Sequence, residues 1–238
     1  SDGFALRPEA VKKCLNPRTQ GILINSPANP TGTVLSPAYL QEIAGLGPYI
    51  VSDEIYHGLV YGEREHSILE YTDRAFVLNG FSKLYAMTGW RLGYIIAPRE
   101  FVRPIQKLQQ NLFICASSVS QFAGLAALTQ HHPEVEQMVA AYDKRRKFMV
   151  QGLRELGFGV AAEPTGAFYV LADARNVCSS SLNLAFDILD KAQVAVAPGI
   201  DFGTNAEGFL RFSYANSIEN IGLAFERLKA YLTTYCSS

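Results

Sequence analysis

The chain has 238 residues, of which 48% are apolar and 18% are charged, and its formal net charge is −1. This composition is enough for a sizeable hydrophobic core, and the near-neutral charge argues against a nucleic-acid partner. The sequence has no apolar stretch of membrane-spanning length, so we expect no membrane association and a cytoplasmic location.

Three apolar runs in the first half of the chain each end in polar residues. Residues 21–24 precede Asn-Ser-Pro-Ala-Asn-Pro-Thr-Gly at positions 25–32. Residues 50–52 lead into Asp-Glu-Ile-Tyr at positions 53–56, and residues 75–78 lead into Asn-Gly-Phe-Ser-Lys at positions 79–83. In open parallel sheets, ligands bind beyond the carboxyl ends of the strands. We therefore expect these segments to converge on one site.

Lys83 is the candidate for covalent chemistry. It lies on the short connection between residues 75–78 and the strand-like run 92–97, which predicts partial desolvation. Burial disfavours the ammonium form, and the free amine is the form that reacts with an aldehyde to give a Schiff base. A solvated loop lysine is the alternative when Lys83 is considered alone.

The second half of the chain has a different pattern. Apolar residues at helical spacing predict one helix over residues 133–156, which ends at Gly157. This half also contains further strand candidates and an amphipathic final helix, which together predict an α+β domain. The expected strands are 167–171, 194–197 and 209–215, and the final helix is expected to start at Asn216. A domain boundary near residue 140 would fall inside the long helix.

The cysteines and histidines show no spacing typical of a metal site or of a disulfide framework. We therefore expect reduced thiols and no bound metal. The cysteines are Cys14, Cys115, Cys178 and Cys236, and the histidines are His57, His66, His131 and His132.

Five motifs occur in an order that resembles the class I and II, fold-type I pyridoxal-phosphate-dependent aminotransferases, over essentially the whole chain. They are Asn-Pro-Thr-Gly from Asn29, Asp-Glu-Ile-Tyr from Asp53, Ser-Lys ending at Lys83, Gly-Trp-Arg-Leu-Gly around Arg91, and Arg-Phe-Ser-Tyr-Ala from Arg211. The resemblance implies an α/β fold in two domains. Residues 1–140 would be the C-terminal portion of a cofactor-binding large domain with a mostly parallel sheet, and residues 141–238 an α+β small domain. It also implies that an N-terminal part, with a phosphate-binding loop and a ring-stacking aromatic residue, is missing.

The same resemblance assigns four residues to the reactive part of the cofactor. Lys83 would form the Schiff base with pyridoxal 5′-phosphate and move the substrate's α-proton. Asp53 would pair with the pyridinium nitrogen and keep it protonated. Tyr56 and Asn29 would donate hydrogen bonds to the cofactor's phenolic oxygen. Considered alone, Asp53 could be a turn or cap residue and Asn29 a turn initiator.

Two arginines and a serine receive anion-binding roles. Arg91 would hold the cofactor phosphate, and Arg211 would bind the substrate α-carboxylate in a bidentate pair. A core ion pair is the alternative for Arg211. Many family members place a serine three residues before the lysine, but that position is Gly80 here. Ser82 is then the nearby hydroxyl available to the phosphate.

The implied activity is transfer of an amino group from an L-amino acid to a 2-oxo acid by a homodimeric enzyme. A C–S lyase or related carbanion chemistry is an alternative on the same fold, since fold does not fix function. A non-catalytic effector domain and an inactive fragment are further alternatives. The motifs do not select a particular amino acid.

Overall fold

The computed structural model describes residues 3–62 and 64–235, which form two compact units. Unit 2 consists of Leu6–Pro27 and Val34–Val139. Unit 1 consists of the described residues of Ser1–Ala5, Ala28–Thr33 and Ala140–Ser238. The predicted assignment of residues 1–140 and 141–238 to a large and a small domain stays a prediction.

Unit 2 is built on a four-stranded sheet in the order β1-β2-β3-β4. The first three strands are parallel and β4 is antiparallel, so the sheet is mostly parallel, as predicted. The elements are α1 (Pro8–Cys14), β1 (Gly21–Asn25), α2 (Pro37–Ala44), β2 (Tyr49–Asp53), η1 (Ile68–Glu70), β3 (Ala75–Gly80), η2 (Thr88–Trp90), β4 (Gly93–Ile96), α3 (Arg99–Leu112) and α4 (Ser118–Thr129).

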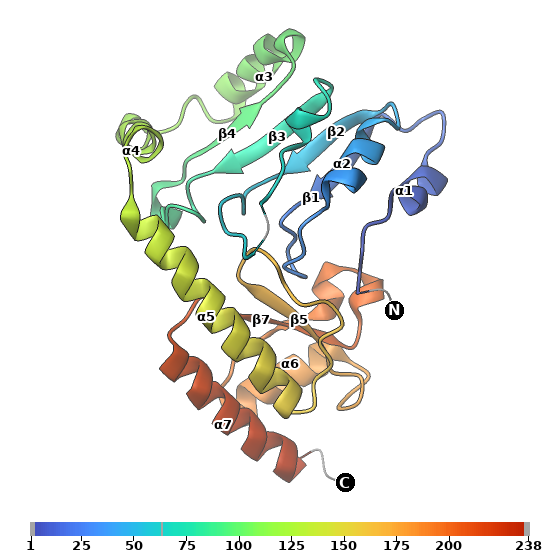
Figure 1. The fold of residues 1–238 in the computed structure, drawn as a ribbon, viewed down its shortest axis with the longest axis vertical. Helices are drawn as coiled ribbons and strands as arrows, with labels where there is room; N and C mark the ends of the chain where they lie inside the picture. Colours follow the sequence, from blue (N-terminus) through green and yellow to red (C-terminus); the bar gives the residue numbers. More distant parts are fainter. Residues whose placement is uncertain (1–2, 63, 236–238) are drawn as a thin grey trace. The chain divides into compact units, whose positions relative to one another are not determined.

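The core of unit 2 lies where α2 and η1 cover one face of this sheet (Figure 1). Side chains alternate along a strand, so Ile22 and Ile24 of β1 point to the same face and are both buried. Helix α2 is capped by Ser36, whose hydroxyl accepts a hydrogen bond from Tyr39 N at 3.3 Å. This start places Leu40 and Ile43 on the face that packs against the strands.

Unit 1 contains a three-stranded antiparallel sheet in the order β5-β7-β6. Its elements are β5 (Tyr169–Asp173), α6 (Ser181–Ala192), β6 (Ala197–Pro198), η3 (Gly199–Phe202), η4 (Thr204–Ala206), β7 (Phe209–Ser213) and α7 (Ile218–Tyr235). Helix α5 (Pro133–Glu155) runs from unit 2 into unit 1 and matches the predicted 133–156. Gly157 follows it with φ +87°, a conformation that suits glycine.

The predicted edges of four elements in unit 1 were wrong by two or three residues. Strand β7 ends at Ser213 instead of residue 215. Strand β5 starts at Tyr169 instead of residue 167, because Ala167 has φ +55° and cannot continue a strand. Helix α7 starts at Ile218 instead of Asn216, because Ser217 acts as a cap and accepts a hydrogen bond from Asn220 N. Strand β6 begins only at Ala197, the first residue there that pairs with β7.

Residues 28–33, which include Asn29, belong to unit 1 although β1 just before them belongs to unit 2. The carbonyl of Gly32 accepts hydrogen bonds from Thr165 N at 2.9 Å and Gly166 N at 2.7 Å. Gly32 has φ +69°, and a Cβ atom there would lie 2.4 Å from the Cβ of Pro164. Only glycine fits this close approach, which explains the last residue of the Asn-Pro-Thr-Gly motif.

Candidate functional site

The carboxyl ends of the parallel strands in unit 2 lie side by side. Asn25, at the end of β1, pairs in register with Asp53, at the end of β2, and Asp53 pairs with Leu78 of β3. The carbonyl of Asp53 accepts hydrogen bonds from Asn25 Nδ2 at 3.0 Å and from Ser26 N at 3.1 Å. The sheet therefore brings together the strand ends whose convergence the sequence predicts.

Asp53 and Tyr56 are held by a tight turn after β2. The Asp53 carboxylate accepts a hydrogen bond from Ile55 N at 3.1 Å, and His57 N donates to the carbonyl of Glu54 at 2.9 Å. These residues form turns, so Asp53 does not cap a helix here. The Tyr56 side chain is buried, with 3% of the residue exposed. The turn fixes a carboxylate and a phenol three residues apart.

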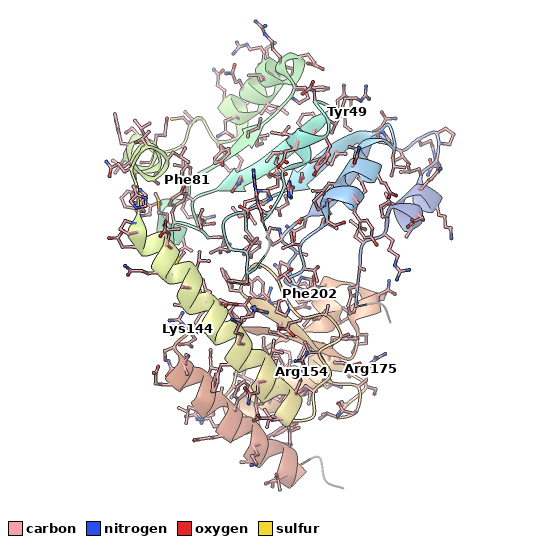
Figure 2. The ribbon with its side chains drawn as sticks, viewed as in Figure 1. Tyr49, Phe81, Lys144, Arg154, Arg175 and Phe202 are labelled. Carbon is pink, nitrogen blue, oxygen red and sulfur yellow. The ribbon has the colours of Figure 1, made fainter. Side chains whose placement is uncertain are left out.

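Lys83 lies on the connection between β3 and β4, as predicted, and is partly buried. Its Nζ atom is 5.7 Å from the centroid of the Tyr56 ring. Hydrogen bonds from Phe81 N to Leu92 O at 3.3 Å and from Met87 N to Phe81 O at 3.1 Å close this connection. Phe81, which is labelled in Figure 2, is buried. The fold thus places the lysine amine beside the phenol of the neighbouring turn.

The predicted phosphate-binding residues lie on the same connection. Arg91 is exposed and has a left-handed backbone conformation, and its Nη1 donates to Thr88 O at 3.1 Å. Ser82 is partly buried. A Cβ atom at Gly80 would lie 3.2 Å from Gly93 Cα and 3.2 Å from Ile55 Cδ1. A side chain at position 80 would therefore require these neighbours to shift by a few tenths of an ångström.

Arg211 and Asn29 are brought together in unit 1, although 182 positions separate them in the sequence. Arg211 lies inside β7, and its Nη1 donates to Asn29 Oδ1 at 2.8 Å. The guanidinium carbon is 4.3 Å from the ring centroid of Tyr169 and 4.9 Å from that of Phe202, which is labelled in Figure 2. The buried Nε atom has no hydrogen-bond partner among the residues described. Among the described residues, no carboxylate forms an ion pair with Arg211.

Tyr169 and Phe202 were not among the predicted site residues. The motifs that contain them, Gly-Ala-Phe-Tyr at 166–169 and Pro-Gly-Ile-Asp-Phe-Gly at 198–203, stand out through their glycines. A Cβ atom at Gly199 would lie 1.9 Å from Ala206 O, so this glycine is required by packing. Contact between the two rings and Arg211 depends on how η3 and the strands meet, which the sequence does not reveal.

The arrangement combines an amine, a guanidinium, two hydroxyls and a carboxylate in unit 2. Such a set suits a ligand that carries an aldehyde, an anionic group and a basic ring nitrogen. Among the described residues, no group of three or more His, Cys, Asp or Glu side chains is placed to hold a metal ion. No helix in residues 3–62 and 64–235 is both long and apolar enough to cross a membrane. Cys236 lies outside the described residues.

Comparison with known proteins shows which family this chain belongs to. The family model for aminotransferase class I and II matches residues 1–228. The chain is 41% identical to (5-formylfuran-3-yl)methyl phosphate transaminase of Methanocaldococcus jannaschii over 94% of this chain and 60% of that protein. It is 38% identical to aspartate/prephenate aminotransferase of Thermus thermophilus over 97% of this chain and 61% of that protein.

Solved structures give the same result. An aromatic aminotransferase from Pyrococcus horikoshii superposes with a TM-score of 0.93 at 37% identity, over 98% of this chain and 65% of that one. The chain therefore spans about three fifths of the length of the relatives it matches. The predicted α/β fold of the fold-type I aminotransferases is confirmed.

Proposed function

Because this chain belongs to the aminotransferase class I and II family, we propose that it carries the catalytic lysine and the substrate-carboxylate arginine of a transaminase. The reaction is transfer of an amino group from an L-amino acid to a 2-oxo acid. The observation that carries the proposal is the position of Lys83 Nζ, 5.7 Å from the Tyr56 ring in the same unit as Asp53.

The side chains of this chain fit pyridoxal 5′-phosphate by their donor chemistry. Lys83 would hold the cofactor covalently, and Asp53 would keep a proton on its ring nitrogen. Arg91 and Ser82 would bind the phosphate, for which a permanently charged planar guanidinium is well suited. Tyr56 would donate its hydroxyl hydrogen to the phenolic oxygen. When bound, the cofactor supplies an electron sink for the charge that develops at the substrate α-carbon.

Asn29 keeps its proposed place among the cofactor-binding residues. An amide side chain has an acceptor oxygen and separate donor hydrogens. Its oxygen accepts from Arg211, so the same side chain can serve as a donor through nitrogen. The bond between the two residues is therefore compatible with both proposed roles.

The remaining steps belong to Lys83 and Arg211. Lys83 Nζ is the base that removes the proton from the substrate α-carbon and later returns it. Arg211 orients the substrate through its carboxylate, because two parallel N–H groups match the two carboxylate oxygens. The Tyr169 and Phe202 ring centroids lie 4.3 and 4.9 Å from the Arg211 guanidinium carbon. These rings restrict the orientation of the guanidinium, which reduces the entropy lost on binding.

The visible absorbance spectrum with pyridoxal phosphate is the direct test. We expect a band that changes when amino acids are added, and borohydride should fix the cofactor to the peptide that contains Lys83. Formation of a new amino acid from an added 2-oxo acid would then establish transamination. Release of ammonia without an acceptor would indicate a lyase instead. A folded protein labelled equally at Lys107 or Lys144 would contradict the assignment of Lys83.

A further inference from the structure

Glu54 has a buried carboxylate at the centre of the turn after β2. Only 3% of the residue is exposed. Its Oε1 atom accepts hydrogen bonds from Ser52 Oγ at 3.0 Å, Ser67 Oγ at 3.1 Å and Ile68 N at 3.0 Å. Its Oε2 atom lies 3.4 Å from His57 Nδ1. Burial of a carboxylate is unfavourable unless hydrogen bonds compensate, and here three donors converge on one oxygen.

These bonds join two separate parts of unit 2. Ser52 belongs to β2, whereas Ser67 and Ile68 form the start of η1. The backbone of Glu54 is also fixed, because its N–H donates to Leu78 O in β3 at 2.9 Å and its carbonyl accepts from His57 N at 2.9 Å. Glu54 is therefore attached through its side chain and its main chain at once.

The residues on either side of Glu54 are those proposed to contact the cofactor. Asp53 precedes it directly and Tyr56 follows two positions later. We propose that Glu54 is a positioning residue, whose carboxylate holds the turn so that the Asp53 carboxylate and the Tyr56 hydroxyl face the cofactor. This inference rests on the proposed function. The inference adds Glu54 as a residue that acts through Asp53 and Tyr56 and not by contact with the cofactor.

A purely structural anchor would have the same hydrogen bonds, so the test needs a matched control. Glu207 in unit 1 is also a bonded carboxylate, which accepts from Ser181 N at 2.6 Å and from Ser181 Oγ at 3.1 Å. Glu54→Gln and Glu207→Gln make the same chemical change. Each retains an acceptor oxygen and removes the charge that strengthens its hydrogen bonds.

The first measurement needs no cofactor. Ile55 N donates to Asp53 Oδ1 at 3.1 Å, so exchange of the Ile55 amide proton reports on the Asp53 carboxylate. In the protein without added cofactor, Glu54→Gln should speed this exchange by about tenfold. Glu207→Gln should leave it unchanged. Unchanged Ile55 exchange in folded Glu54→Gln would overturn the proposal.

The second measurement follows pyridoxal phosphate. Glu54→Gln should weaken its binding by about tenfold, the lower end of what is lost when a residue that orients a metal ligand is replaced. It should also shift the pH at which the visible band titrates, because Asp53 and Tyr56 set the charge on the bound ring. A lower unfolding midpoint with unchanged affinity and titration would mean that Glu54 is only an anchor.

Two outcomes separate this proposal from the proposed function. If the wild-type protein binds no pyridoxal phosphate, the proposed function fails, whereas Ile55 exchange still tests whether Glu54 holds Asp53. If Glu54→Gln does not fold, Ser67→Ala removes one of the three donors to Oε1. It should change Ile55 exchange and cofactor affinity in the same direction by a smaller factor, and no change in either would count against the proposal.

Discussion

The two units hold their proposed site residues by different means. In unit 2, Asp53 ends the paired strand β2 and Lys83 lies shortly after β3. Main-chain hydrogen bonds close the segment that carries Lys83, and the buried Glu54 carboxylate adds its bonds beside Asp53. In unit 1, Arg211 lies inside a strand, and its guanidinium is placed by side chains, the Tyr169 and Phe202 rings and an amide. Replacement of a neighbouring side chain should therefore disturb Arg211 more readily than it disturbs Lys83.

The same difference separates the two proposed tasks. The residues of unit 2 are proposed to hold the cofactor throughout the reaction, which favours a rigid support. Arg211 is proposed to bind and release a different substrate in each half-reaction. An arginine in contact with two rings is restricted in orientation while its outer nitrogens remain able to exchange partners. Variants of Lys83 and of Arg211 should accordingly affect cofactor retention and substrate affinity separately.

Lys83→Ala should have the largest effect. Loss of the amine removes both the covalent attachment and the base, so kcat should fall by about 10³-fold or more. Cofactor should no longer be fixed by borohydride, while the far-ultraviolet circular dichroism stays that of the wild type. Lys107→Ala, in the exposed part of α3, is the control and should keep wild-type kcat. Retained turnover in Lys83→Ala would contradict the assignment of the catalytic base to unit 2.

Arg211→Ala should act on substrate and leave the cofactor in place. We expect KM for the amino acid to rise by about 10²-fold, because a charge-assisted bidentate pair is lost. Arg175→Ala is a matched control in the same unit, since the Arg175 guanidinium lies 5.0 Å from the Phe209 ring and pairs with Asp173. Titration with pyridoxal phosphate measures the cofactor affinity of both variants. Equal losses of cofactor and substrate affinity in Arg211→Ala would contradict the proposed role.

Gly32→Ala tests how Asn29 is held in unit 1. Both Gly32 and Gly47 have positive φ, but a Cβ atom at Gly47 would have no heavy atom within 4 Å. Gly47→Ala should therefore lower the free energy of unfolding by only about 1 kcal/mol, the cost of the backbone conformation. Gly32→Ala should cost about 2 kcal/mol or more, because its Cβ overlaps Pro164 and Tyr169 O. Urea unfolding of both variants measures the difference, and equal losses would show that residues 28–33 are not tightly packed.

Local patterns allowed much of this arrangement to be predicted. The position of Lys83 between two strands follows from apolar runs, and the extent of α5 follows from Pro133 at its start and Gly157 just after its end. The carboxyl ends of β1 and β2 converge because parallel strands share an edge. Each of these predictions depends on residues within one element or on a general rule of sheets.

Features that depend on distant contacts were not predictable in the same way. The placement of residues 28–33 in unit 1 depends on hydrogen bonds between Gly32 and residues 165–166. The burial of Glu54 depends on η1, whose Ser67 lies 13 positions away. The sequence identifies both segments as motifs, but it does not indicate which distant residues they contact.

Acid should weaken unit 1 through a charged cluster, the smallest of the expected effects. Asp143 accepts hydrogen bonds from Arg146 Nη2 at 2.8 Å and Nε at 2.9 Å, and lies 2.7 Å from Lys147 Nζ. Burial raises the pKa of Asp143, but the bonds from Lys147 and Arg146 outweigh it and hold the pKa below its usual value of 3.8. A carboxyl with a lowered pKa stabilises the folded state above pH 3.8, and this contribution is lost as the pH falls through the folded pKa.

Asp143→Asn removes the titrating group. Between pH 6 and pH 3, the variant should therefore lose about 1 kcal/mol less free energy of unfolding than the wild type loses. Lys147→Gln should reproduce part of this change. Circular dichroism follows the whole chain, and fluorescence of Trp90, the single tryptophan, follows unit 2. If Asp143→Asn and the wild type differ in their pH dependence by circular dichroism and not by Trp90 fluorescence, the acid sensitivity lies in unit 1. An identical pH dependence for Asp143→Asn and the wild type would rule out this cluster as its source.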